Sequence, residues 1–211
     1  MPVIDIDAFR AAPLAESPFR YAVVPRFVPE VALEGIAADY PAIDRGGSFP
    51  LGALRFGPAF AALCDDLSGD ALRAAFEEKF DMDLTGRPTT LTVRGRCRPK
   101  DGRIHTDSRS KLITVLLYLN EGTWQAEGGR LRLLRSATDL SDCIAEVAPD
   151  GGTMLCFHNT PNAWHGHAPF DGERRVLQLN WVTGEAAARS SERRHGLSAL
   201  LKRIGSRRRR N

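Results

Sequence analysis

The chain has 211 residues, of which 43% are hydrophobic and 26% charged. These values are typical of a folded globular domain and exclude collagen, a coiled coil and wholesale disorder. No run approaches the roughly 18 apolar residues that a membrane span requires. The N-terminus carries Asp5 and Asp7 where a signal peptide would carry basic side chains. We therefore expect a single-domain cytoplasmic protein.

The net charge of +3 is unevenly distributed. Residues 184–211 hold nine Lys and Arg against two Glu, which gives +7 and leaves −4 for the rest of the chain. The four cysteines form no CxxC motif, so reduced thiols are expected. The charge pattern separates a basic C-terminal segment, 184–211, from the remainder.

Residues 1–87 are predicted to form a support region of helices and short strands. The segment 19–28 is typical of a strand that Pro25 interrupts, and Pro29 opens a helix over 29–40 because proline is tolerated in a first helical turn. Apolar residues at helical spacing predict further helices over 59–67 and 69–82. The stretch 45–57 is the most loop-like of the chain.

After residue 87 the pattern changes to short runs rich in Thr, Val, Ile and Leu, separated by Gly, Asp, Asn and Pro. Seven such strands without intervening helices predict a β-sandwich or jelly roll over 88–183. The expected strands are 89–97, 111–119, 129–135, 142–148, 152–157, 163–168 and 174–182. Beyond them, Leu197, Leu200, Leu201 and Ile204 form one stripe of a predicted amphipathic helix over 195–204.

The segment IHTDS contains the first candidate site residues, His105 and Asp107. In an extended segment, side chains two residues apart point to the same side, so this imidazole and carboxylate can meet at one point. His165 can supply a third ligand from another strand, and two His with one carboxylate suit non-haem Fe(II). The alternative is that these histidines only bond backbone carbonyls. Arg174, nine residues beyond His165, could hold the distal carboxylate of an oxo acid.

Several further motifs occur in one order along residues 88–182. They are the HxD pair, the strand end Tyr118-Leu119-Asn120, Trp124, the GGxLxL run from Gly128 to Leu133, the GxxxxF strand from Gly152 to Phe157, His165, and the GxR of Gly172 and Arg174. As a set they resemble the 2-oxoglutarate/Fe(II)-dependent dioxygenases, in particular the prolyl-hydroxylase-like branch. The resemblance implies a double-stranded β-helix, or jelly roll, in a mainly β chain with N-terminal helices.

The resemblance also implies roles for individual residues. His105, Asp107 and His165 would hold Fe(II), while Arg174 and Tyr118 would bind the C5 carboxylate of the cosubstrate 2-oxoglutarate. With O2, such an enzyme releases succinate and CO2 as it oxidises its substrate, and a carboxylate ligand favours hydroxylation over halogenation.

Three positions qualify this assignment. Thr114 lies four residues before Tyr118 on the same side of the strand and is a second expected contact of the cosubstrate. Many relatives have a hydroxyl residue where this chain has Val176. Binding of the cosubstrate carboxylate is therefore expected to depend more on Tyr118 and Thr114. His167 is the alternative metal ligand, and the nine-residue interval to Arg174 favours His165 over it.

The sequence indicates the substrate less clearly than it indicates the metal and the cosubstrate. Arg94, Arg96 and Arg98 fall on one side of a strand by period-two counting, followed by Lys100 and Arg103. They are either a solvated edge or a basic rim suited to an anionic sugar, lipid head group or peptide.

The amphipathic helix and Arg207–Arg210 either cap the domain or bind an anionic membrane surface at the inner face of the membrane. The absence of an RNA-binding motif or zinc finger argues against nucleic acid.

The competing function class is a non-catalytic or 2-oxoglutarate-independent, cupin-like metal-binding jelly roll. Arg174 and Tyr118 would have no evident task in such a protein.

Overall fold

The computed structural model describes residues 3–191 and 193. Its helices are α1 (Ile6–Ala11), α2 (Glu30–Ala38), α3 (Pro58–Leu67) and α4 (Asp70–Phe80), with a 3₁₀ turn η1 (Leu51–Ala53). Its strands are β1 (Tyr21–Val24), β2 (Phe49–Pro50), β3 (Thr89–Cys97), β4 (Lys111–Tyr118), β5 (Leu131–Leu134), β6 (Cys143–Val147), β7 (Met154–His158), β8 (Trp164–Gly166) and β9 (Gly172–Val182).

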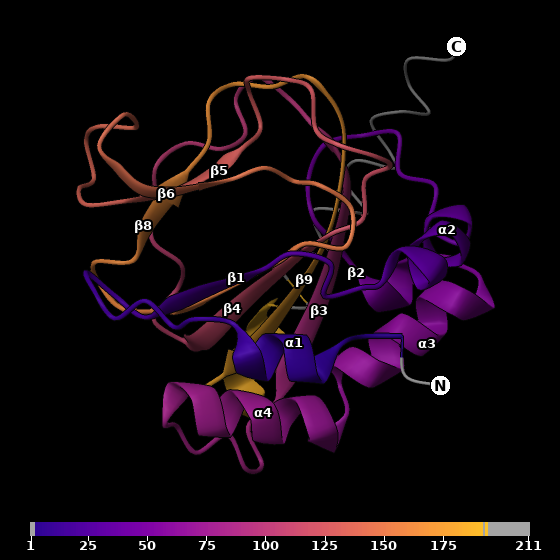
Figure 1. Ribbon diagram of the computed structural model, residues 1–211, viewed down its shortest axis with the longest axis horizontal. Coiled ribbons are helices and arrows are strands. Elements are labelled where there is room, and N and C mark those ends of the chain that lie inside the picture. The colour runs from indigo at the N-terminus through magenta and orange to yellow at the C-terminus, as the bar shows by residue number, and fades with distance from the viewer. Residues whose placement is uncertain (1–2, 192, 194–211) are drawn as a thin grey trace.

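The strands form two antiparallel sheets. The larger has the order β1-β7-β4-β9-β3-β2 and the smaller β6-β5-β8. Figure 1 shows the helices gathered on one side of the larger sheet and the smaller sheet on the other. The smaller sheet and the inner face of the larger one form the two walls of a jelly roll, and the helices cover the outer face.

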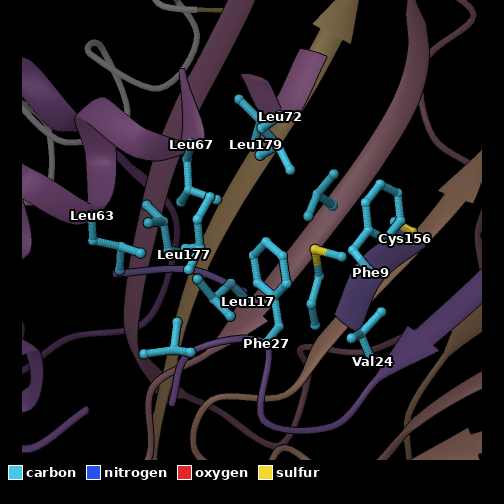
Figure 2. Close-up of a cluster of buried hydrophobic side chains, with 14 of the residues drawn as sticks. Phe9, Val24, Phe27, Leu63, Leu67, Leu72, Leu117, Cys156, Leu177 and Leu179 are labelled. Atoms are coloured by element: carbon cyan, nitrogen blue, oxygen red, sulfur yellow. The ribbon is translucent and has the colours of Figure 1, made fainter. Parts of the chain in front are cut away.

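Successive side chains of a strand point to opposite faces of the larger sheet, so every second residue contacts the helices. On β9, Leu177, Leu179 and Trp181 face the helices and are buried. The Trp181 ring lies 4.7 Å from that of Phe76 on α4, between ring centroids. Figure 2 shows this core, in which side chains of α1, α3 and α4 meet those of β4, β7 and β9. Each fully buried side chain of this size contributes about 1.5–3 kcal/mol to folding.

The inner face of the larger sheet carries both apolar and polar side chains. Toward the smaller sheet, Tyr118, Leu155, Phe157 and Val176 pack against Leu133 and its neighbours in a second core. Beside this apolar group, Thr92, Thr114, Gln178 and Asn180 line a cavity. A polar inner face beside an open cavity marks where a ligand can enter the jelly roll.

The observed fold agrees closely with the sequence prediction. The mainly β chain with N-terminal helices and a jelly-roll core is confirmed, and each of the seven strands expected after residue 87 is present, shifted by at most two residues at either end. The sequence did not predict α1, and the stretch expected to be a loop contains β2 and η1.

The basic C-terminal segment is described only in part. Residues 185–191 are helical, whereas the predicted helix over 195–204 and Arg207–Arg210 lie outside the described residues. Within the described part of the chain, no helix is long and apolar enough to cross a bilayer.

Candidate active site

Two histidines from different parts of the jelly roll lie side by side. His105 stands in the connection between β3 and β4, and His165 stands on β8 of the smaller sheet. Their backbones form an isolated antiparallel bridge, in which both distances from the amide nitrogen to the carbonyl oxygen are 3.0 Å. Their imidazole rings are 4.3 Å apart between centroids. The fold therefore brings together two histidines that are sixty residues apart in the sequence.

Backbone carbonyls orient both imidazoles. Nδ1 of His105 lies 2.8 Å from the carbonyl oxygen of Arg103, and Nδ1 of His165 lies 2.9 Å from that of Ala163. A ring that donates its Nδ1 proton to a carbonyl keeps the lone pair on Nε2, the arrangement that metal-binding histidines use. These hydrogen bonds are compatible with metal binding, so a contact to a backbone carbonyl does not argue against either histidine as a ligand.

Asp107 completes the group. One ligand atom from each of His105, Asp107 and His165 lies within 4.8 Å of the other two. On Asp107, Oδ1 accepts from Lys111 Nζ at 2.8 Å and Oδ2 accepts from the Thr114 hydroxyl at 2.6 Å. Burial opposes ionisation of this carboxyl, yet Lys111, His165 and Thr114 hold the pKa of Asp107 below its ordinary value. The site thus contains an ionised carboxylate beside two imidazoles.

Burial keeps His165 neutral. It is 4% exposed, and burial, aided by the neighbouring His105, lowers the pKa of His165 to about 4. A neutral imidazole is the form that coordinates a metal. Two imidazoles and one carboxylate fit Fe(II) with coordination positions left open.

His167 lines the same cavity but lies outside the three-residue group. It follows the end of β8, its backbone N–H donates to the carbonyl of Gly102 at 2.8 Å, and its Nδ1 lies 2.8 Å from the carbonyl oxygen of Ala168. Its ring packs against Gly102, whose φ of +84° and lack of a Cβ leave room for it. His165 and His167 thus line the same cavity, as their two-residue spacing predicted, but the group of three close ligand atoms contains His165 and not His167.

Arg174 and Tyr118 form a second cluster on the inner face. The guanidinium carbon of Arg174 lies 5.2 Å from the centre of the Tyr118 ring, and Arg174 Nε donates to the carbonyl of Gly129 at 2.8 Å. Tyr118 Oη and Arg174 Nη2 are buried and find no hydrogen-bond partner among the described residues. Burial also raises the pKa of Tyr118 and keeps its proton on the hydroxyl. Two unsatisfied donors inside a protein fit a carboxylate ligand.

Thr114 lines the cavity, but its hydroxyl is already engaged. Besides Asp107, the oxygen lies 3.2 Å from Asn180 Oδ1. A hydroxyl has one proton to donate, so in this geometry Thr114 supports Asp107.

The three arginines of the predicted basic rim do not all line the cavity. Arg94 lines the cavity, a space of about 300 Å³ that also holds His105, Asp107 and His165 on its wall. Arg96 is exposed and pairs with Asp171 at 2.8 Å, and Arg98 pairs with Asp101 at 3.1 Å. The pairing of β3 with β9 shifts register between Arg94 and Arg96, which breaks the alternation on which the rim was predicted. Among the described residues, Arg94 is the one member of the three that faces the site.

Some residues of the cavity were missed by the sequence analysis. Lys111, which pairs with Asp107, stands four residues after it, and Gln178 and Asn180 continue the alternation of Arg174 and Val176 along β9. Counting by two from Arg174 would have found the last two. Ser48, from the segment expected to be a loop, also lines the cavity and gave no signal in the sequence.

Comparison with protein families decides the class. Residues 96–183 match the model of the 2OG-Fe(II) oxygenase superfamily. This segment is a 2-oxoglutarate/Fe(II) oxygenase domain. The enzyme class and the use of Fe(II), 2-oxoglutarate and O2, which the motifs implied, are thereby confirmed. No curated protein matches the chain.

Solved structures share the fold at low identity. A prolyl-4-hydroxylase of Pseudomonas putida matches 85% of this chain and 93% of its own, with a TM-score of 0.54 and 21% identity. The collagen prolyl hydroxylase of Paramecium bursaria Chlorella virus-1, in complex with 2-oxoglutarate, matches 78% and 96%, with a TM-score of 0.55 and 14% identity. HygX of Streptomyces hygroscopicus, with nickel and 2-oxoglutarate bound, matches 77% and 82%, with a TM-score of 0.51 and 16% identity.

Proposed function

We propose that this oxygenase hydroxylates its substrate with release of succinate and CO2, using Fe(II) held by His105, Asp107 and His165. The observation that carries the proposal is the meeting of these three donors, each fixed by its own hydrogen bonds, in one cavity with Arg174. Bound Fe(II) supplies the activation of O2. A carboxylate ligand occupies a position that a halide would otherwise take, which favours hydroxylation.

The protein's part in this chemistry is orientation. The carbonyls of Arg103 and Ala163 direct the two Nε2 lone pairs, and Lys111 and Thr114 fix the Asp107 carboxylate in its ionised form. Such outer partners tune the strength and geometry of a metal site.

The proposed cosubstrate pocket lies around Arg174 and Tyr118. Their unsatisfied Nη2 and Oη would donate to the C5 carboxylate of 2-oxoglutarate, while the Arg174 Nε bond to Gly129 fixes the guanidinium. Thr114 is a proposed further contact, which requires its hydroxyl to turn from Asp107. His167, outside the group of three donors, is the weaker choice as a metal ligand.

The proposed substrate is a small molecule, glycan or peptide with an anionic group. The similar structures include enzymes named for prolyl residues and for collagen, at identities that support only the shared fold. A cytoplasmic location, with Arg207–Arg210 at an anionic membrane surface, is proposed from the sequence alone.

The test is an anaerobic titration of the Fe(II)-loaded protein with 2-oxoglutarate, followed through the weak visible charge-transfer band that forms when an oxo acid chelates iron. We expect a band in the wild type, none in Asp107→Ala, and at least about tenfold weaker 2-oxoglutarate binding in Arg174→Gln, since a charge-assisted hydrogen bond is lost.

The matched control is Arg175→Gln. This neighbouring arginine pairs with Glu173 and the carbonyl of Ala37, away from the cavity, and its loss should leave 2-oxoglutarate affinity unchanged. An iron-bound wild type without the band would favour the cupin-like alternative. Equal effects of the two arginine variants would show the cosubstrate assignment to be wrong.

A further inference from the structure

We propose that Arg94 is the anchor for an oxyanion, a carboxylate or phosphate, on the substrate. This inference rests on the proposed function and narrows it, since it assigns the substrate's charge to one side chain. Arg94 lies on the inner face of β3, where its Cα pairs with that of Val176 on β9, and it lines the same cavity as the three metal-binding candidates.

Arg94 has a partly buried positive charge without a carboxylate partner. Its Nε donates to the hydroxyl of Ser48 at 2.8 Å, and this neutral contact is its one side-chain hydrogen bond among the described residues. The acid whose charge acts on it, Asp101, is engaged in an ion pair with Arg98. Burial lowers the pKa of Arg94, which reports the cost of keeping this charge out of water. Buried charges are ordinarily paired, so the guanidinium is prepared for a ligand.

The charge balance of the cavity supports an anionic substrate. Among the described residues that line it, three cationic side chains (Arg94, Lys111 and Arg174) face one carboxylate (Asp107). Fe(II) and the 2-oxoglutarate dianion have equal and opposite charges, so binding both leaves this positive excess unchanged. Arg174 would be matched by the cosubstrate and Lys111 is matched by Asp107. Arg94 is the cationic side chain of the cavity lining that remains unmatched.

Ser48 fixes the orientation of the Arg94 guanidinium, so Arg94 should be more selective for its anion than an arginine on the surface. It is 9% exposed, lines the cavity and holds the guanidinium by its Nε edge. The remaining nitrogens of the guanidinium form a fork that matches two oxygens of a carboxylate or phosphate. The cavity of about 300 Å³ is at the small end of ligand pockets, roughly 300–1,000 Å³, and 2-oxoglutarate would take part of it. The enclosed part of the substrate is therefore compact.

The experiment measures oxyanion binding directly. Methyl phosphate and acetate are titrated calorimetrically into protein loaded with Mn(II) and 2-oxoglutarate, with methanol as the neutral control. We expect Arg94→Gln to weaken binding of at least one anion by about tenfold or more, the range for a lost charged hydrogen bond. Arg94→Lys, which keeps the charge, should weaken it less. Arg96→Gln is the matched control and should have no effect, because Arg96 is exposed and pairs with Asp171.

Two further comparisons make the outcome decisive. Glycerol 3-phosphate against glycerol and N-acetylaspartate amide against N-acetylasparagine amide separate a phosphate-bearing substrate from an acidic peptide. Ser48→Ala removes the partner of Arg94 without touching its charge, and should weaken anion binding even if Arg94→Gln does not fold.

The inference is overturned if Arg94→Gln binds both anions like the wild type. It is also overturned if this variant weakens 2-oxoglutarate as much as Arg174→Gln does, because Arg94 would then serve the cosubstrate. A wild type that forms no charge-transfer band contradicts the proposed function instead. A normal band with no anion binding contradicts only the role of Arg94.

Discussion

At the scale of single residues, the environment of Asp107 determines how it can serve a metal. Both carboxylate oxygens accept hydrogen bonds, one from an ammonium and one from a hydroxyl. The side chain is therefore held in one orientation before any ligand binds. Preorganisation of this kind avoids reordering the carboxylate on metal binding and is what outer partners of metal ligands contribute.

Replacement of Thr114 by valine tests this role. Valine has nearly the shape of threonine but no hydroxyl, so Oδ2 of Asp107 loses its 2.6 Å donor. We expect Mn(II) affinity, measured calorimetrically on the metal-free protein, to fall by about tenfold, the lower end for the loss of such a partner. Thr114→Ser keeps the hydroxyl and should restore most of the affinity. Wild-type affinity in the valine variant would show that Lys111 suffices to orient Asp107.

At the scale of elements, β9 serves the core with one face and the site with the other. Leu179 is 1% exposed and faces the helices, whereas Gln178 faces the cavity and donates to Asn180 Oδ1 at 3.0 Å. Neighbouring residues of one strand should therefore respond differently to truncation.

Leu179→Ala should lower the free energy of unfolding by about 2–5 kcal/mol, because it leaves a cavity in the core shown in Figure 2. Gln178→Ala should cost less than about 1 kcal/mol, since it loses one partly exposed hydrogen bond. Urea denaturation of the metal-free protein measures both. A larger loss in the glutamine variant would contradict the assignment of the two faces.

The same alternation explains how much the sequence could predict. It located the strands well, because Thr, Val and Leu repeat with period two between turn residues, and β3 was predicted at its observed bounds. It also placed Arg174 and Tyr118 on the correct strands.

The rest depends on contacts between distant segments. The register shift after Arg94 has only a weak local signal, the isolated Gly95 inside the strand, and it breaks the alternation on which Arg96 was expected to face the cavity. Ser48 reaches the site because β2 pairs with β3, a contact between segments some forty residues apart. Lys111 could be recognised as a partner of Asp107 only when the turn between them was known. Such pairings are tertiary, and single-sequence patterns do not contain them.

At the scale of the whole molecule, the proposed metal site joins two layers. His165 belongs to the smaller sheet, whereas His105 and Asp107 lie in the connection that leads from β3 to β4 of the larger sheet. The contacts here include the backbone bridge and the imidazole pair of His105 and His165, and the Phe157 ring of β7 lies 4.9 Å from that of His165 between centroids. A metal that binds all three side chains would cross-link the walls of the jelly roll in the folded state only.

Metal should therefore stabilise the entire fold. A ligand that binds only the native state adds about 2.7 kcal/mol at a concentration a hundred times its Kd, and for a domain of this size each kcal/mol raises Tm by roughly 2–4 °C. Thermal unfolding followed by circular dichroism should thus show a rise of about 5–10 °C with excess Mn(II), reversed by a chelator. Asp107→Ala, which lacks the carboxylate ligand, should show little or no rise at the same Mn(II) concentration. A Tm that is unchanged in the wild type would mean that the three donors do not act as one site, and an equal rise in Asp107→Ala would place the stabilising metal elsewhere in the chain.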